Sequence, residues 1–303
     1  MICADIIFIV GPTAVGKSEV GFYLAKRLDG EIVSCDSMQV YREINIASNK
    51  PSPETRRAVP HHMIDIVSIT ESFDVARFNV LARRAIEGIE QRRRVPIVVG
   101  GSGLYMQVLL DGIFEGGQRD EAFRRRMWAL AKEKGPEVLH GMLTGVDPEA
   151  ARKIHPRDIK KTIRALEVCQ RQGRPISEAQ KDRRGLWEEK KVRVFALNQD
   201  REHLYAKINQ RVERMAGEGL LEEIQRLKDW PWSQTARGLI GVKEVLDFFN
   251  GKGTWTETLA LIQRNTRRLA KRQLTWFRRD PRIEWVDVPE DGCLSSVAER
   301  IYG

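Results

Sequence analysis

Cysteine is scarce in this chain of 303 residues, and the few cysteines are not arranged as a metal site or a disulfide framework. No two of the four, at positions 3, 35, 169 and 293, share the C-x-x-C spacing of a zinc site or a redox motif. We therefore expect a protein of a reducing compartment. His61 and His62 lack cysteines or carboxylates at zinc spacing around them, which favours a structural or hydrogen-bonding role for both.

Long apolar runs are also missing. None approaches the roughly 20 residues that a helix needs to cross a bilayer, and the N-terminus lacks a basic segment followed by a cleavable apolar stretch. We therefore expect a soluble, cytoplasmic protein with no membrane partner. Hydrophobic residues make up 42% and charged residues 31% of the chain, a balance that excludes a disordered protein and allows a sizeable core.

Negative charge is in deficit. The 51 lysines and arginines outnumber the 42 aspartates and glutamates, and the formal net charge is +9. An excess of this size indicates a polyanionic partner, most often nucleic acid, although a basic metabolic enzyme is also compatible with it. The charge thus suggests a class of partner without specifying a reaction.

What the chain does contain is an alternation of short apolar runs and helical patterns. The β-branched runs occupy residues 6–10, 31–35, 95–99 and 192–197, and helical patterns cover about 17–27 and 74–92. Runs of this kind are typical of parallel strands covered on both faces. The fold class expected is therefore α/β, with a P-loop NTPase-like parallel sheet flanked by helices.

The strand pattern disappears in the middle of the chain. Residues 117–185 are polar, basic and helical in character, and the strand-like run 192–197 follows them. We expect an inserted all-helical domain at 117–185, within a core formed by residues 1–116 and 186–303. The stretch from 201 to about 279 is predicted to be mostly helical.

Residues 11–18 read GPTAVGKS and directly follow the first apolar run. This is the G-x-x-x-x-G-K-[ST] spacing of a phosphate-binding loop between a strand and a helix. In such a loop, backbone N–H groups and the helix N-terminus attract phosphate, Lys17 adds a positive charge and Ser18 can hold Mg²⁺. The motif predicts phosphate binding without indicating which phosphate is bound.

Asp36 is the only carboxylate at a strand end near this loop, because the run 95–99 ends in glycines. It is compatible with a metal ligand of a kinase, with a proton acceptor beside the phosphate, or with a helix cap formed together with Ser37. Gln39 follows three residues later, and its amide can pair with the edge of adenine. Chemistry on an adenine amine is thus one of the open interpretations.

Arg211 lies on the apolar stripe of its predicted helix, with Leu204 and Ile208. A charge is seldom fully buried there without a partner, so Arg211 is either a ligand of an anion or an arginine that extends from the edge of the stripe.

A basic stripe follows at helical spacing, formed by Arg264, Arg267, Arg268, Lys271 and Arg272. Aromatic and basic residues come next, in the segment TWFRR. The combination suits phosphate contacts and stacking of unpaired bases, and a solvated helix face is the alternative.

Taken together, these motifs resemble those of the tRNA dimethylallyltransferases (tRNA isopentenyltransferases). The matching segments cover nearly the whole chain: GPTAVGKS (11–18), DSMQVY (36–41), PHHMID (60–65), VGGSGLY (99–105), HPRDIKKTIRALEV (155–168), GRPISE (173–178), INQRVERMAGEGLLEE (208–223), GLIGVKE (238–244) and KRQLTWFRR (271–279). The resemblance implies transfer of a dimethylallyl group from its diphosphate to N6 of the adenosine 3′-adjacent to the anticodon in tRNAs, with release of pyrophosphate. It also implies Mg²⁺ as the cofactor, and we expect a monomer.

The resemblance further assigns roles to residues. Asp36 is the expected general base, Lys17, Arg211 and Ser102 are the other catalytic residues, and Ser18 is the Mg²⁺ ligand. Ser102 stands where the family more often has threonine. The expected diphosphate contacts are Gly11, Thr13, Ala14, Val15, Gly16, Lys17, Ser18 and Arg211. The expected tRNA contacts are Asp36, Ser37, Met38, Gln39, Ser102, Arg124, Lys160, Lys161, Arg164, Gly238, Gly241, Lys243, Lys271, Arg272, Gln273, Trp276 and Arg278.

Three other functions remain as alternatives. An isopentenyltransferase acting on free adenine nucleotides would share the loop and Asp36, but the basic insertion and KRQLTWFRR favour tRNA. A P-loop small-molecule kinase is disfavoured because no second strand-end carboxylate is visible. A non-catalytic RNA-binding protein with a vestigial loop would explain the charge but not Asp36 beside an intact Lys17.

Overall fold

The computed structural model describes residues 4–114, 120–289 and 292–303. The chain divides into two compact units, one formed by Met1–Leu110 with Glu189–Gly303 and the other by Asp111–Glu188. We call them the core unit and the helical unit. The expected domain boundary at 116–117 lies outside the described residues, as does Cys3.

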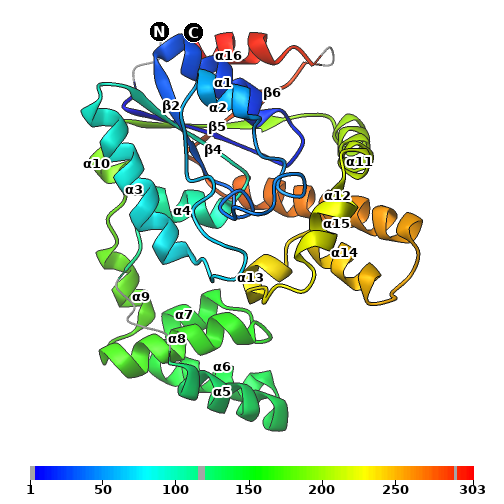
Figure 1. Cartoon of the computed structure of the whole chain (residues 1–303). Coiled ribbons are helices and arrows are strands. Elements are labelled where there is room, and N and C mark those ends of the chain that lie inside the picture. Colours follow the sequence, from blue (N-terminus) through cyan, green and yellow to red (C-terminus); the bar gives the residue numbers. More distant parts are fainter. Residues whose placement is uncertain (1–3, 115–119, 290–291) are drawn as a thin grey trace. The chain divides into compact units, whose positions relative to one another are not determined.

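The core unit is built on a six-stranded sheet in which every pair of neighbours is parallel (Figure 1). In spatial order the strands are β3 (His61–His62), β2 (Gly30–Ser34), β4 (Val95–Val99), β1 (Ile6–Val10), β5 (Val192–Asn198) and β6 (Ile283–Asp287). All five residues of the inner strand β1 are buried. The expected P-loop NTPase-like parallel core with a helical insertion is confirmed.

Strands β3 and β6 have no counterpart among the predicted apolar runs. β3 has two residues, and β6 is an edge strand with one buried position out of five. Within the sheet, Glu284 of β6 forms an ion pair with Arg193 of β5, 2.5 Å apart. An edge strand that is mostly exposed and carries a charged cross-strand pair has little of the apolar pattern from which strands are predicted.

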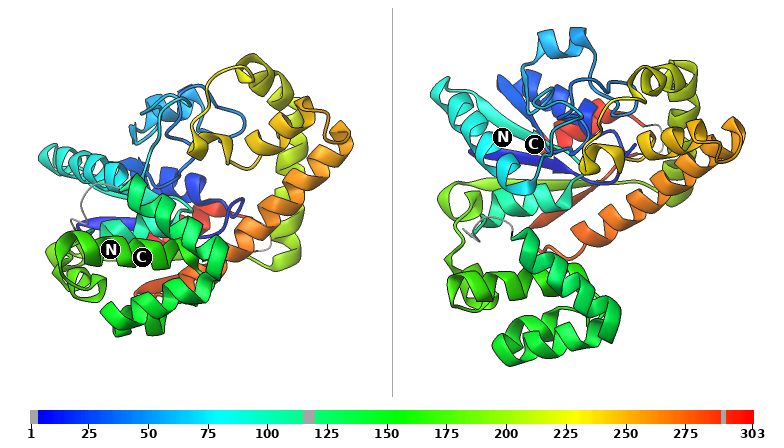
Figure 2. Two further views of the ribbon diagram at one scale, coloured as in Figure 1. Left: turned by 90° about the horizontal axis from the view of Figure 1, so that it is seen from below. Right: turned by 60° about the horizontal axis from the view of Figure 1, so that its bottom comes forward.

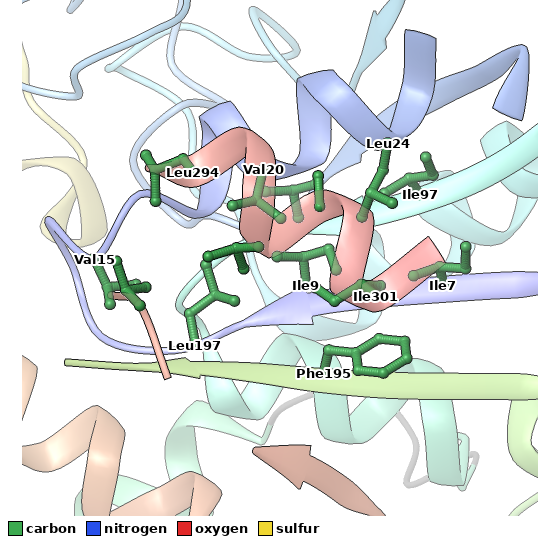
Figure 3. Close-up of a cluster of buried hydrophobic side chains, with 14 of the residues drawn as sticks. Ile7, Ile9, Val15, Val20, Leu24, Ile97, Phe195, Leu197, Leu294 and Ile301 are labelled. Atoms are coloured by element: carbon green, nitrogen blue, oxygen red, sulfur yellow. The ribbon is translucent and has the colours of Figure 1, made fainter. Parts of the chain in front are cut away.

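Helices cover both faces of the sheet. On one face, α1 (Lys17–Leu28) and α16 (Leu294–Tyr302) pack against each other and the strands, and Figure 3 shows Ile7 and Ile9 of β1 among side chains from both helices. Because successive strand residues point to opposite faces, Phe8 is directed at the other side. There α3 (Val75–Gln91) and α4 (Gly103–Asp111) lie along the sheet (Figure 1).

Two long helices extend the core unit beside the sheet. They are α11 (Arg201–Gly217) and α15 (Trp255–Phe277), and they pack side by side, in yellow-green and orange in Figure 2. The shorter helices of the core unit are α2 (Pro53–Ala58), α12 (Leu220–Leu227), α13 (Gln234–Arg237) and α14 (Val242–Phe249). Leu204 and Ile208 of α11 and Ala270 of α15 belong to the core cluster that also contains Ile7 and Ile9.

The helical unit has a hydrophobic core of its own, centred on Leu139, Leu143, Ile163 and Val168. Its helices are α5 (Glu121–Lys134), α6 (Pro136–Val146), α7 (Pro148–Lys153), α8 (Ile159–Gln172), α9 (Ile176–Ala179), the 3₁₀ turn Gln180–Asp182 and α10 (Leu186–Glu189), whose last residue belongs to the core unit. Across the described parts of both units, we find no helix whose length and apolarity would suit it to span a membrane.

Candidate active site

The phosphate-binding loop connects β1 to α1, as the sequence predicts. Gly16, the residue before the helix, has a left-handed backbone with a φ of 98°, which a side chain would disfavour. The N–H groups of residues 14–18 donate to no other residue in the described part of the chain. The loop and the N-terminus of α1 therefore present unpaired N–H groups together, the arrangement that attracts an anion.

A cavity of about 740 Å³ opens at this loop. Its walls come from the loops that follow β1, β2 and β4 and from helices α11 and α15, at the carboxyl ends of parallel strands, where open α/β sheets bind ligands. The predicted site residues that line it are Thr13, Ala14, Gly16, Lys17, Ser18, Asp36, Ser37, Met38, Gln39, Ser102, Arg211, Arg272, Gln273 and Trp276.

Two half-buried cations face the loop inside this cavity. The Lys17 ammonium donates to the carbonyl of Pro12 at 2.6 Å, and the Arg211 guanidinium donates to the Thr13 hydroxyl at 3.0 Å. Burial lowers the pKa of Lys17 to about 8, against the opposite influence of Asp36. Burial also lowers the pKa of Arg211. Such charges are costly without an anion, so the site is built to receive one.

Helix α11 contributes three further polar residues to the cavity that the sequence analysis missed. They are Lys207, Gln210 and Arg214, and with Arg211 they recur at i, i+3, i+4 and i+7 along one face of the helix. The spacing of these four residues in the sequence indicates a polar helix face. Only Arg211 also lies next to the apolar stripe, so it is the only one of the four whose position in the sequence is unusual.

Asp36 lies two residues beyond the end of β2, next to Cys35. Its Oδ1 accepts the backbone N–H of Met38 at 2.8 Å, which fixes the turn at 36–38. No further hydrogen bond reaches this carboxylate from the described residues. Burial raises the pKa of the neighbouring Cys35 thiol well above its usual range, so Cys35 stays neutral.

The Gln39 amide is held by two partners that line the same cavity. Its Oε1 accepts from the Ser34 hydroxyl at 2.7 Å, and its Nε2 donates to the carbonyl of Asn49 at 3.4 Å. Each amide group retains one further hydrogen-bonding position. Gln39 is therefore oriented by the protein and can still pair with a ligand in the cavity.

Helix α15 is anchored to the loops of the site through Gln273. Its Oε1 accepts the N–H of Thr13 at 2.8 Å, and its Nε2 donates to the carbonyl of Gly101 at 2.9 Å. A Cβ on Gly101 would lie 2.4 Å from Gln273, and one on Gly103 would lie 2.3 Å from Trp276. The glycines after β4 thus allow α15 to approach, which leaves the Trp276 ring at the cavity, 41% exposed.

The remaining predicted residues lie outside the cavity lining. In the core unit these are Gly11 and Val15 of the loop, Gly238 and Gly241 at helix ends, and the exposed Lys243, Lys271 and Arg278. Not all of the basic stripe on α15 is exposed. Arg267 donates to the Asn209 side chain at 2.5 Å and lies over the Tyr205 ring, so it ties α15 to α11.

In the helical unit, two predicted arginines share one carboxylate. Arg124 donates twice to the fully buried Glu167, at 2.9 and 2.8 Å, and Arg164 donates to it at 2.7 Å. Burial opposes the charge of Glu167, but these bonds lower its pKa to about 2. Lys160 and Lys161 on the same helix are exposed.

The adjacent histidines make hydrogen bonds within the protein. His62 Nε2 lies 2.6 Å from the buried carboxylate of Glu31, and His61 Nδ1 lies 2.7 Å from the carbonyl of Val59. Residues 4–114, 120–289 and 292–303 contain no cluster of three or more His, Cys, Asp or Glu side chains that could hold a metal ion. A metal ion bound in the cavity would therefore have to take most of its ligands from a bound anion and from water.

Comparisons with known proteins agree on one family. The family model described as IPP transferase matches residues 39–280. The chain is 45% identical over 298 residues to the tRNA dimethylallyltransferase of Carboxydothermus hydrogenoformans and 43% identical over 308 residues to that of Geobacillus thermodenitrificans, covering 98% of this chain and 96% and 95% of those proteins.

Solved structures give the same result. A full-length tRNA isopentenylpyrophosphate transferase from Bacillus halodurans is similar with a TM-score of 0.72 and 38% identity, over 99% of this chain and 96% of that one. A eukaryotic dimethylallyltransferase acting on tRNA is similar with a TM-score of 0.83 and 28% identity, over 98% of this chain and 77% of that one. The chain belongs to the IPP transferase family, whose curated members are named tRNA dimethylallyltransferases.

Proposed function

We propose that the protein transfers a dimethylallyl group from dimethylallyl diphosphate to N6 of the adenosine 3′-adjacent to the anticodon in tRNA. The observation that carries the proposal is that one cavity contains both the phosphate-binding loop with Lys17 and the segment with Asp36 and Gln39. A donor diphosphate and an acceptor adenine would meet there. The loop is then occupied by an isoprenoid diphosphate and later by pyrophosphate.

The leaving group receives the electrostatic assistance that this reaction needs. As the bond between C1 of the dimethylallyl group and the diphosphate oxygen breaks, negative charge accumulates on the diphosphate. Lys17, Arg211 and the N–H groups of residues 14–18 surround the position that it would occupy. Fixed cations and dipoles in a site with little water stabilise such developing charge more strongly than bulk water does.

A magnesium ion fits this site only together with the diphosphate. The Ser18 hydroxyl and the carboxylates of Glu19 and Asp36 are oxygen donors at the cavity, too few to enclose the ion, and Mg²⁺ is commonly held by one or two protein oxygens with phosphates and water. Bound there through Ser18, the ion would neutralise charge on the leaving diphosphate.

Asp36 is the general base in this proposal. The N6 amine becomes strongly acidic only as its bond to C1 forms, so a carboxylate can accept its proton at that stage. The carboxylate already holds the turn at Met38 with one oxygen, which leaves the other to face the amine. The Ser102 hydroxyl lines the same cavity and would contact the reacting centre.

Adenine recognition is assigned to cavity residues of the Asp36 segment and of helix α15. Gln39 would pair with the base edge, and Trp276 would stack on an unpaired base. The base must leave its own stack, because N6 cannot otherwise reach a buried electrophile. Arg272 in the cavity lining and the exposed Lys271 and Arg278 would contact the RNA backbone.

The helical unit is proposed to bind the anticodon stem-loop. Lys160 and Lys161 are exposed and suited to phosphate contacts. Arg124 and Arg164 would contact the RNA through the guanidinium N–H groups that are not bonded to Glu167. The core-unit residues Gly238, Gly241 and Lys243 would complete the tRNA contact.

A parallel assay tests the proposal against its rivals. The protein is incubated with Mg²⁺, labelled dimethylallyl diphosphate and either unmodified tRNA or AMP, while ATP hydrolysis is followed separately. Label on tRNA alone is the expected result. Label on AMP would identify a nucleotide isopentenyltransferase, and ATP-dependent phosphoryl transfer a kinase. Asp36→Asn, isosteric and uncharged, should abolish transfer and leave tRNA affinity nearly unchanged.

A further inference from the structure

Glu223 is a buried carboxylate that has no part in the proposed diphosphate binding or proton transfer. It lies in the first turn of α12 and is 3% exposed. A buried glutamate needs hydrogen-bond donors that satisfy its charge. Here the donors are three consecutive backbone N–H groups from a segment almost 180 residues earlier in the chain.

The three bonds are short and converge. Glu223 Oε1 accepts from Asn45 at 2.7 Å and from Ile46 at 2.9 Å, and Oε2 accepts from Ala47 at 2.9 Å. Residues 45–47 belong to no helix or strand, so they have no ladder to fix them. Within the loop itself, Asn49 N–H donates to the carbonyl of Ile46 at 3.0 Å and Lys50 N–H to that of Asn45 at 3.2 Å, so the carboxylate is what ties this locally bonded turn to α12.

The fixed loop ends at Asn49, which reaches the site from two sides. The Asn49 carbonyl accepts from Gln39 Nε2 at 3.4 Å, and the Asn49 Oδ1 accepts from Arg214 at 3.3 Å. Asn49 has a left-handed backbone with a φ of 47°, a conformation that depends on its surroundings. Ser48, Asn49, Gln39 and Arg214 all line the cavity. Glu223 does not line it, so its influence on the site is indirect.

We infer that Glu223 is a positioning residue: by holding the N–H groups of residues 45–47 it sets the position of Asn49 and thereby the orientation of the Gln39 amide. The inference rests on the proposed function, in which Gln39 pairs with adenine. It extends that function, because Glu223 would hold Gln39 at a fixed position relative to the phosphate-binding loop.

Glutamine is the informative replacement, because Glu223→Gln keeps the size of the side chain. One of its two ends becomes an NH₂ donor, which faces a backbone N–H, so at least one N–H of the loop loses its acceptor. The loop should shift, and misplacing a reacting group by about 1 Å can cost on the order of 100-fold in rate. We expect kcat/KM for tRNA to fall about 10- to 100-fold, with KM for dimethylallyl diphosphate unchanged.

Glu222→Gln is the matched control. Glu222 precedes Glu223 on α12 and is not buried, so the same change in charge on the same helix should leave both KM values as they are. If Glu223→Gln does not fold, Ser48→Ala loosens the same loop by removing the Ser48 hydroxyl bond to the carbonyl of Ile44. It should lower kcat/KM for tRNA in the same direction.

A double-mutant cycle with Gln39→Ala decides between positioning and general destabilisation. If Glu223 acts through Gln39, Gln39→Ala should cost much less in the Glu223→Gln background than in the wild type. Additive losses would overturn the inference while leaving the role of Gln39 intact. If Gln39→Ala alone does not affect transfer to tRNA, adenine pairing by Gln39 fails first, and the inference fails with it.

Discussion

The Arg211 guanidinium donates to the Thr13 hydroxyl across 198 residues of sequence, at 3.0 Å. The contact joins helix α11 to the phosphate-binding loop and leaves the remaining donors of a half-buried guanidinium available to the cavity that Arg211 lines. It also explains how a charge can lie beside the apolar stripe of Leu204 and Ile208, which are fully buried in the core.

Replacing Arg211 should therefore weaken donor binding selectively. We expect Arg211→Gln to raise KM for dimethylallyl diphosphate about 10- to 100-fold, because a hydrogen bond to a charged group contributes about 1.5–3 kcal/mol. Steady-state kinetics with each substrate varied in turn measures the effect. Arg214→Gln is the control on the same helix face. Arg214 donates to Asn49, which in turn binds Gln39, so this variant should raise KM for tRNA instead. Equal effects of both variants on the donor would contradict the assignment.

Lys17 predicts a pH dependence of diphosphate binding. Burial lowers its pKa to about 8 in the free protein, and a bound diphosphate favours the charged form and raises that pKa again. The affinity for pyrophosphate should thus be fully present below about pH 8 and fall as the pH rises above it, by up to about tenfold per unit.

Calorimetric titration with pyrophosphate between pH 7 and 9.5 measures this effect. The ligand itself gains charge over part of that range, so the comparison is with Lys17→Arg, whose guanidinium stays protonated throughout. The ratio of the two affinities should change near pH 8. A ratio that stays constant over the whole range would show that Lys17 does not titrate in the free protein.

The parts of this site that could be predicted are those specified by neighbouring residues. The loop GPTAVGKS, the inner strands and the turn at Asp36 all depend on contacts within a few positions, and a single sequence contains that information. The bond from Thr13 N–H to Gln273 spans 260 residues, and no local pattern reports it. Gln273, a predicted tRNA contact, makes both of its hydrogen bonds, to Thr13 and Gly101, within the protein.

Charge patterns were informative about partners but not about exposure. Arg124 and Arg267 belong to clusters whose pattern is typical of a solvated basic surface. In the structure, one donates to the buried Glu167 and the other to Asn209. The sequence could not separate such arginines from exposed lysines, because helical spacing fixes the face of a residue and leaves open what lies opposite that face.

Gln273 should affect the loop more than RNA binding. Gln273→Leu removes the acceptor of the Thr13 N–H and the donor to Gly101, both partly buried. The cost expected is about 1–3 kcal/mol, seen as weaker pyrophosphate binding and a lower midpoint of thermal unfolding. Filter binding of tRNA at constant salt is the control measurement. A loss confined to tRNA affinity would show that the bridge to the loop is unimportant.

Glu31 predicts a dependence of stability on acid. Its carboxylate is buried and binds Arg92 and His62. The hydrogen bond from Arg92, together with that from His62, lowers its pKa to about 2 in spite of burial. A lowered carboxyl pKa stabilises the folded state above the unfolded value, near 4.5, and this contribution is lost as the pH falls towards 2.

Urea unfolding of the wild type and Glu31→Gln checks that sign. The wild type should be more stable by about 3 kcal/mol at pH 6 to 7, and the difference should shrink as the pH falls from about 4.5 to 2. A difference that is independent of pH would mean that the contribution of Glu31 comes from packing and not from its charge.

The two kinds of cation on α15 should respond differently to salt. Lys271 is exposed and is proposed to bind an RNA phosphate, whereas Arg267 is held by Asn209 and the Tyr205 ring. Removing one cation that binds a phosphate lowers the slope of log affinity against log salt by about 0.7–0.9. Lys271→Gln should therefore flatten the salt dependence of tRNA binding by about that amount, and Arg267→Gln should leave the slope unchanged while lowering the free energy of unfolding.

Binding isotherms at several salt concentrations distinguish the cases. If Arg267→Gln flattens the slope as much as Lys271→Gln does, its guanidinium must leave Asn209 to reach the RNA, and the α11–α15 packing rearranges when tRNA binds.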